Sequence, residues 1–210
     1  DRAALGDAAA AARLEVLTPL AKAHGTDIGC EVASLGIQVH GGMGYVEETG
    51  AARFLRDARV TPIYEGTNGI QAADLVGRKL ALDGGAAFDR LLADIRDGTS
   101  DQRIRDLADA CATIGERLRG ADADDRLAAS YPFLTMLSVA TAAWLLMLVF
   151  YAGMSCNLLL ALSYLQGAAL TVCKAIIGVL CVIVLAVGAY LFLLIARYEN
   201  TLKEHFVNAG

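Results

Sequence analysis

The sequence has no cluster of basic residues: 18 Lys and Arg stand against 23 Asp and Glu, for a formal net charge of −5. Proteins that bind nucleic acid through its phosphates need a positively charged patch, so we exclude nucleic acid as a partner. The five cysteines form no C-x-x-C pair and no zinc-type cluster with histidine. We therefore predict no metal site and no disulfide framework, and we interpret the cysteines as small buried side chains in a reducing compartment.

Strand-like alternation is also nearly absent, since almost no segment alternates apolar and polar residues with period two. Apolar positions instead recur at helical spacing within segments that end at glycines. The sequence therefore predicts an all-α fold, a helical bundle in which amphipathic helices pack their apolar stripes together. The chain starts at Asp1 without an initiator Met or a signal-peptide pattern, so we interpret it as the middle of a longer protein.

Glycines, prolines and capping residues set the expected bounds of these helices. Thr67, for example, is placed to cap the helix that follows it, and Gly25 is expected to end the first helix. The glycine-rich segment 41–44 is expected to be a flexible loop, and 120–125 a short acidic linker. The predicted helical ranges are 1–23, 28–39, 50–55, 68–82, 86–95 and 103–118.

Charge is missing from two long stretches near the C-terminal end. No Asp, Glu, Lys or Arg occurs between Arg126 and Lys174, or between Lys174 and Arg197. A helix there has no polar face, and about twenty apolar residues are enough to cross a bilayer. One interpretation is a membrane-attached helical hairpin of roughly 144–165 and 175–196. The alternatives are a join or frame error in the source sequence and, least favoured, a large soluble helical core.

Two motifs carry chemical information. The first is Gln38–Tyr45 (QVHGGMGY), where glycine-rich backbone after a helix can approach a phosphate closely. The second contains Arg56–Arg59 (RDAR) and Ile63–Thr67 (IYEGT), and its Thr67 opens a helix whose exposed N–H groups favour an anion. Taken alone, the glycine-rich motif could also be a loop that only ends a helix. Glu65 could likewise be an acidic residue that is favoured before a helix by the helix dipole, with no catalytic role.

Both motifs in this order resemble the C-terminal helical domain of the acyl-CoA dehydrogenases. The continuation at 74–85 and the segment 128–134 are similar to a subgroup with an extra helical C-terminal region, the methylthiopropanoyl-CoA dehydrogenases. The resemblance covers residues 1 to about 146. The resemblance and the uncharged apolar stretches together predict four segments. These are a C-terminal domain fragment at 1–85, the extra helical region at 86–143, apolar helices at 144–197 and a polar terminus at 198–210.

The resemblance implies an FAD-dependent oxidoreductase of fatty acid metabolism that dehydrogenates an acyl-CoA thioester between its α and β carbons. Glu65 matches the base that removes the α-proton, while the β-hydrogen leaves as hydride to the flavin. Such a base must be a carboxylate held close to the α-carbon. The Glu65 N–H is expected to help bind the thioester carbonyl, and Tyr64 and Gly66 to belong to the substrate site.

The resemblance also assigns cofactor contacts. Gln38, Gly41 and Gly42 match residues that reach the FAD of a neighbouring subunit, and Thr67 and Gly69 match positions beside the FAD near the base. Gly69 stands where many members have Gln, so no side-chain contact is expected there. The implied partners are the acyl-CoA substrate, an electron-transfer flavoprotein as acceptor and further copies of the enzyme in a dimer or tetramer.

Two neighbouring groups are given structural roles. His40 is interpreted as a loop histidine with a satisfied hydrogen bond, and the alternative is a position near the flavin phosphate. The charged side chains of Arg56–Arg59 are interpreted as an ion-pair network that holds the Glu65 loop. Enzymes of this kind also have an N-terminal helical domain and a middle β domain. Neither is present in the sequence, so the active site is expected to be incomplete.

The apolar tail supports an alternative function, a catalytically inert, membrane-anchored helical module. The expected location is the cytoplasm, where acyl-CoA is available, with membrane attachment through 144–196 in the hairpin interpretation. In that case Arg197 and Lys203 lie on the cytoplasmic side, where positive residues collect. A version that ends near Asp125 is expected to stay soluble.

Overall fold

The computed structural model describes residues 6–163, with side chains described as far as Cys156. This part of the chain is helical and contains no strand, which confirms the predicted all-α fold. The longer helices are α1 (Ala8–His40), α4 (Asn68–Gly77), α5 (Ala86–Asp97), α6 (Gln102–Gly120) and α8 (Ser130–Ser163). The shorter elements are α2 (Gly42–Tyr45), η1 (Glu47–Thr49), α3 (Ala51–Arg59), η2 (Lys79–Gly85) and α7 (Ala123–Ala128).

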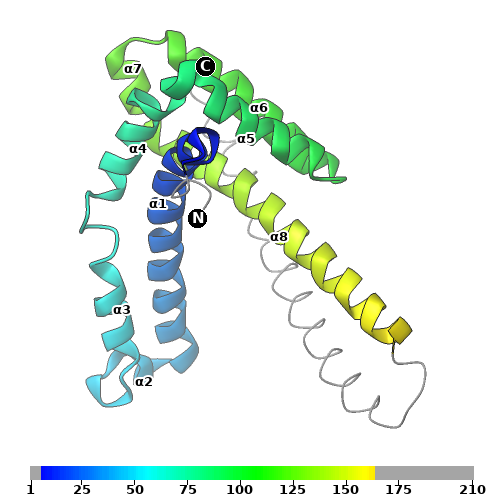
Figure 1. The fold of residues 1–210 in the computed structure, drawn as a ribbon. Helices are drawn as coiled ribbons and strands as arrows, with labels where there is room; N and C mark the ends of the chain where they lie inside the picture. Colours follow the sequence, from blue (N-terminus) through cyan, green and yellow to red (C-terminus); the bar gives the residue numbers. More distant parts are fainter. Residues whose placement is uncertain (1–5, 164–210) are drawn as a thin grey trace.

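One bundle region holds the core, and two arms leave it. In Figure 1, the beginning of α1 meets α4, α5 and the beginning of α8, and α6 packs against α5 and α8. The far end of α1 forms one arm with α2 and α3, and the far end of α8 forms the other. Apolar side chains from α1, α4, η2, α5, α6 and α8 make a single buried cluster, whose largest fully buried members are Leu75, Leu80, Phe88, Leu91, Leu92, Ile95, Phe133, Leu134 and Leu137.

The first helix is longer than predicted. Asp7 caps α1 by accepting the N–H of Ala10 at 3.1 Å, and the helix then runs through Gly25, where a stop was predicted. The Thr26 hydroxyl, just before the predicted second helix, donates to the Lys22 carbonyl of the same helix at 2.7 Å. A glycine inside a helix costs about 1 kcal/mol relative to alanine, which the packing of α1 against α3, α4 and α8 outweighs.

Other predicted bounds shift because of local turns. α3 continues to Arg59, and α4 ends at Gly77 where 82 was expected. The chain then bends through η2, in which Asp83 and Gly84 adopt φ of 56° and 66°. The glycine-rich segment overlaps the short helix α2, and the expected acidic linker overlaps the start of α7, which Asp122 caps by accepting the Asp125 N–H at 2.9 Å.

The first half of α8 is a core helix of the bundle. Phe133, Leu134 and Leu137 are at most 2% exposed, and the Phe133 ring lies 6.0 Å from that of Phe88 between centroids. The segment Ser130–Cys156 is long and apolar enough to cross a membrane, but a buried core helix meets the same criterion. The helix that contains the first expected apolar span therefore starts at Ser130, earlier than the expected 144, and the hairpin stays a prediction.

Beyond the bundle, the distal half of α8 presents apolar side chains to the outside. Leu145, Leu148, Val149, Tyr151 and Met154 are each at least 40% exposed. The second expected apolar helix, 175–196, and the polar terminus, 198–210, lie outside the described residues. The described part of α8 therefore combines a core segment and an exposed apolar segment in one helix.

His24 gives α1 a pH-dependent contribution to stability. Burial lowers its pKa below the ordinary 6.5, and the nearby Asp27 carboxylate opposes that effect in part. The unfolded chain therefore takes up the proton at higher pH than the folded chain. The contribution of neutral His24 is fully present above about pH 6.5 and is lost as the pH falls through the lowered pKa.

We therefore expect His24→Gln to flatten the fall in unfolding free energy between about pH 7 and pH 5. Urea unfolding at several pH values measures this slope, and the same substitution at the exposed His40 is the control. Equal slopes for the parent and the His24 variant would contradict the prediction.

Candidate functional site at the Glu65 turn

The segment between α3 and α4 is a tight turn with an unusual backbone. Glu65 adopts φ of 56° and Gly66 φ of 82°. The left-handed region costs a non-glycine residue roughly 1–2 kcal/mol, and such residues often cluster at functional sites. The N–H of Asn68 closes the turn by donating to the Pro62 carbonyl at 3.0 Å. The surrounding structure therefore holds Glu65 in a conformation that it rarely adopts.

Gly66 is required by both conformation and space. A Cβ at this position would lie 3.3 Å from the Gln71 Nε2 and 3.7 Å from the Ile70 side chain, on a backbone that disfavours any side chain. The Gln71 amide also donates to the Glu65 carbonyl at 3.3 Å. Thr67 caps α4 as predicted, because its hydroxyl accepts the Ile70 N–H at 3.3 Å.

The side chain of Glu65 is exposed, and within residues 6–156 its carboxylate has no hydrogen-bond or ion-pair partner. Its neighbours Ile63, Tyr64 and Ile70 are also at least half exposed, which is unusual for side chains of this size. A free carboxylate beside exposed apolar side chains is suited to a substrate that has both an acidic proton and an apolar chain.

Hydrogen bonds from Lys22 and the buried Asn68 hold the turn against α1. The Lys22 ammonium on α1 donates to the Gly66 carbonyl at 2.7 Å and to the Asn68 Oδ1 at 2.8 Å. Asn68 is 4% exposed, and its amide nitrogen lies within hydrogen-bond distance of the Ala23 carbonyl and of Asp27. Sequence reasoning missed Lys22 and Asn68, because nothing in the local pattern shows that a residue of α1 meets the start of α4.

The glycine-rich motif lies at the other end of α1. Gln38, Gly41 and Gly42 are exposed there, and the Gly41 N–H donates to the Gln38 carbonyl at 3.0 Å with φ of 61°. A Cβ on Gly41 or Gly42 would meet nothing within 4 Å, whereas one on Gly44 would lie 2.4 Å from the Ile37 carbonyl. The backbone at Gly41 and Gly42 is thus open to close approach from outside.

His40 and the charged residues of α3 have local partners. The His40 Nδ1 lies 2.8 Å from the Gly36 carbonyl, as expected of a satisfied loop histidine. Arg56 pairs with Glu47, and Asp57 lies 3.6 Å from Arg53 in an exposed i,i+4 pair. These pairs do not hold the Glu65 loop, so that expectation is wrong. The reason is that α3 continues past them and directs their side chains outward.

The Glu65 turn and the glycine-rich motif do not meet within one chain. Lys22 contacts the Gly66 carbonyl, and Gln38 lies on the same straight helix about 24 Å farther along the axis, at 1.5 Å per residue. Figure 1 shows α2 at the tip of the arm and the connection between α3 and α4 nearer the bundle. Thr67 and Gly69, in contrast, lie at the start of α4 next to Glu65.

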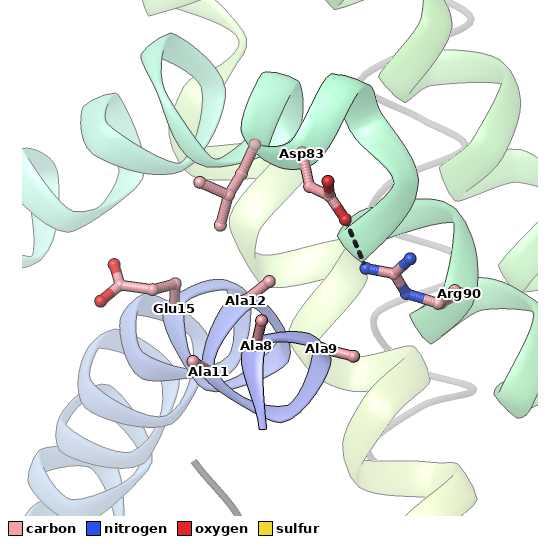
Figure 2. A pocket seen from close by; sticks show the side chains of 8 residues that line it. Ala8, Ala9, Ala11, Ala12, Glu15, Asp83 and Arg90 are labelled. Carbon is pink, nitrogen blue, oxygen red and sulfur yellow. Dashed lines mark hydrogen bonds and ion pairs between the residues drawn. The ribbon is translucent and has the colours of Figure 1, made fainter. Parts of the chain in front are cut away.

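A surface hollow of about 530 Å³ lies near the N-terminal end of α1. Figure 2 shows alanines of α1 on one side and the 2.8 Å ion pair of Asp83 with Arg90 on the other. None of the predicted site residues lines this hollow. The charges of Asp83 and Arg90 neutralise each other in their ion pair. No group of His, Cys, Asp and Glu within the described range is arranged to hold a metal ion.

Comparison of the sequence with known proteins finds similarity to acyl-CoA dehydrogenases in each case. Residues 1–81 match the model of the acyl-CoA dehydrogenase C-terminal domain. The chain is 44% identical over 145 residues to 3-methylmercaptopropionyl-CoA dehydrogenase of Ruegeria pomeroyi, which covers 62% of this chain and 25% of that protein. It is 37% identical over 93 residues to a butyryl-CoA dehydrogenase of Syntrophomonas wolfei, covering 44% of this chain and 15% of the relative.

A third relative is acyl-CoA dehydrogenase family member 11 of Caenorhabditis elegans, 32% identical over 111 residues, which covers 50% of this chain and 18% of the relative. The chain therefore spans a quarter or less of the length of these three proteins. The matched segment contains α1 to α4 with both motifs, and so includes the Glu65 turn. This part of the chain is similar to the C-terminal domain of the acyl-CoA dehydrogenases.

Proposed function

We propose that the chain supplies the catalytic base and part of the FAD site of an enzyme that dehydrogenates an acyl-CoA thioester. The observation that carries this proposal is the Glu65 turn. It presents an exposed carboxylate on a left-handed backbone, inside a segment of the acyl-CoA dehydrogenase family. The three relatives above carry names of acyl-CoA dehydrogenases, and this supports the same reaction class here.

The reaction removes two hydrogens and forms a double bond between the α and β carbons. The Glu65 carboxylate accepts the α-proton, and the β-hydrogen leaves with the electron pair of its bond. FAD, when bound, supplies the acceptor for that hydride. The N–H of Glu65 donates to the thioester carbonyl and stabilises the negative charge that develops as the α-proton leaves. Glu65 thus provides a base through its side chain and a donor through its backbone.

Side chains around the base form the acyl part of the site. Tyr64, half exposed beside Glu65, provides an apolar wall, and Gly66 leaves room for the thioester because it lacks a side chain. Thr67 and Gly69 lie beside the base at the start of α4, where the positive end of the helix dipole favours an anionic group of FAD. An electron-transfer flavoprotein is the proposed acceptor of the electrons from the flavin.

The distance between the motifs supports a role for a second copy of the enzyme. Gln38, Gly41 and Gly42 lie about 24 Å along α1 from the residue that contacts the Glu65 turn. The resemblance to the acyl-CoA dehydrogenases implies that these residues contact the FAD of a neighbouring subunit, and this separation is compatible with that role. We assign them to the FAD of a neighbouring subunit, so the enzyme is at least a dimer.

Gly42→Val tests this assignment. The chain itself tolerates a side chain here, because a Cβ on Gly42 would meet nothing within 4 Å. We expect folding to be preserved and FAD retention to fall, since a side chain blocks close approach of the backbone to the phosphates. The ratio of flavin to protein absorbance after gel filtration measures retention. Gly77→Val, at another open glycine, is the matched control, and an unchanged flavin ratio in the Gly42 variant would contradict the assignment.

Anaerobic titration of the complete enzyme that carries this chain tests the reaction itself. We expect the purified protein to be yellow from bound FAD, and acyl-CoA to bleach the flavin band as electrons pass to it. A panel of thioesters of different chain length identifies the preferred substrate. A protein that binds no flavin and consumes no acyl-CoA would instead support the inert helical module.

We propose a cytoplasmic location, where acyl-CoA is available. The exposed apolar side chains in the distal half of α8 favour membrane contact as an additional property. Co-sedimentation with lipid vesicles measures this contact, and a chain that ends at Met147, before most of these side chains, is the comparison.

A further inference from the structure

Four hydrogen-bonding side chains connect α8 to the Glu65 turn. The Tyr131 hydroxyl, near the start of α8, donates to the Asp27 carboxylate at 2.5 Å. The other oxygen of Asp27 lies 2.9 Å from the Asn68 amide nitrogen. The Asn68 carbonyl oxygen accepts from Lys22 at 2.8 Å, and Lys22 also donates to the Gly66 carbonyl at 2.7 Å. The path therefore runs from α8 through α1 and α4 to the residue after Glu65.

This path is sensitive to the loss of a partner, because its centre is buried. Asn68 is 4% exposed, and a buried amide that loses a partner costs much more than an exposed one. Asp27 contacts Tyr131 with one oxygen and Asn68 with the other, so the direction of its carboxylate depends on both. Hydrogen bonds to a carboxylate are also stronger than neutral ones.

We propose that Tyr131 is a positioning residue for Glu65, a role that rests on the proposed function of Glu65 as the base. Through Asp27, Asn68 and Lys22, the Tyr131 hydroxyl fixes the Gly66 carbonyl and with it the left-handed backbone of Glu65. Tyr131 lies well beyond residue 81, the last residue of the family match. The helical region that follows the matched domain thereby controls the geometry of the base.

Tyr131→Phe removes the hydroxyl and keeps the ring. We expect amide hydrogen exchange in the peptide 62–70 to become about tenfold faster, the effect of losing one hydrogen bond to a charged group. We also expect kcat of the complete enzyme to fall about tenfold with little change in KM, because a misplaced base affects the transition state more than substrate binding. Asn68→Asp and Lys22→Met should also make amide hydrogen exchange faster in the peptide 62–70.

Tyr151→Phe is the matched control. Tyr151 lies on the same helix, and its hydroxyl contacts the exposed Ser100 hydroxyl at 3.2 Å. We expect no change in exchange at 62–70 and no change in kcat. Lys22→Arg, which keeps a donor, should recover part of the activity lost in Lys22→Met. In the double variant, Tyr131→Phe and Lys22→Met should have less than additive effects, since both interrupt one path.

The outcomes separate this proposal from the proposed function. Unchanged hydrogen exchange at 62–70 in Tyr131→Phe overturns the positioning role of Tyr131. Exchange that becomes faster to the same extent in α5 also overturns it, because that result would mean general destabilisation. In another outcome, hydrogen exchange in Tyr131→Phe becomes faster at 62–70 only, while Glu65→Gln leaves turnover unchanged. This combination supports the structural coupling and rejects Glu65 as the base. Selective acceleration with a tenfold fall in kcat supports both.

Discussion

We expect Glu65→Gln to lower kcat of the complete enzyme by about 10²–10⁴, the usual contribution of general-base catalysis. The amide has nearly the same size and shape as the carboxylate, but it cannot accept the α-proton. The side chain is exposed and makes no ion pair among the described residues, so its replacement should leave the fold intact. Unfolding free energy is expected to change by no more than about 0.5 kcal/mol.

Flavin bleaching by acyl-CoA, measured by stopped-flow absorbance, checks the chemical step directly. FAD content should equal that of the parent, because the carboxylate does not hold the cofactor in our proposal. Glu48→Gln, at an exposed position in η1, is the control for a generic loss of charge. Nearly normal bleaching rates in the Glu65 variant would show that the base lies elsewhere.

The second large effect concerns the core. We expect a chain that ends at Asp125 to lose cooperative folding, although the sequence alone suggested that it would stay soluble. This truncation removes Phe133, Leu134 and Leu137, which are nearly fully buried. Reducing one such side chain to alanine typically costs about 2–5 kcal/mol, so the sum is comparable to the entire stability of a domain, about 5–15 kcal/mol.

A chain that ends at Met147 is the matched comparison. It keeps all the side chains that α8 contributes to the core, including Trp144, and drops most of the exposed apolar side chains beyond them. We expect a sharp thermal transition by circular dichroism for this chain and a broad or absent one for the chain that ends at Asp125. A cooperative transition in the shorter chain would show that α8 is dispensable.

The sequence by itself determined the features that depend on neighbouring residues. Thr67 was identified as a helix cap because capping involves an N–H only a few residues away, and the structure confirms it. The all-α class followed from the spacing of apolar residues, which reports directly on the period of the backbone. The two motifs placed the chain near its family for the same reason, since each is a short contiguous segment.

Tertiary structure alone decided which residues far apart in sequence become neighbours. A helix that is apolar on every side can lie in a membrane or in a core, and only contacts with Phe88 and its surroundings place the first half of α8 in the core. Packing likewise carries α1 through Gly25. That continuous helix separates Gln38 from the Glu65 turn and brings Lys22 beneath Gly66. These outcomes depend on burial between distant segments, which no local pattern of residues encodes.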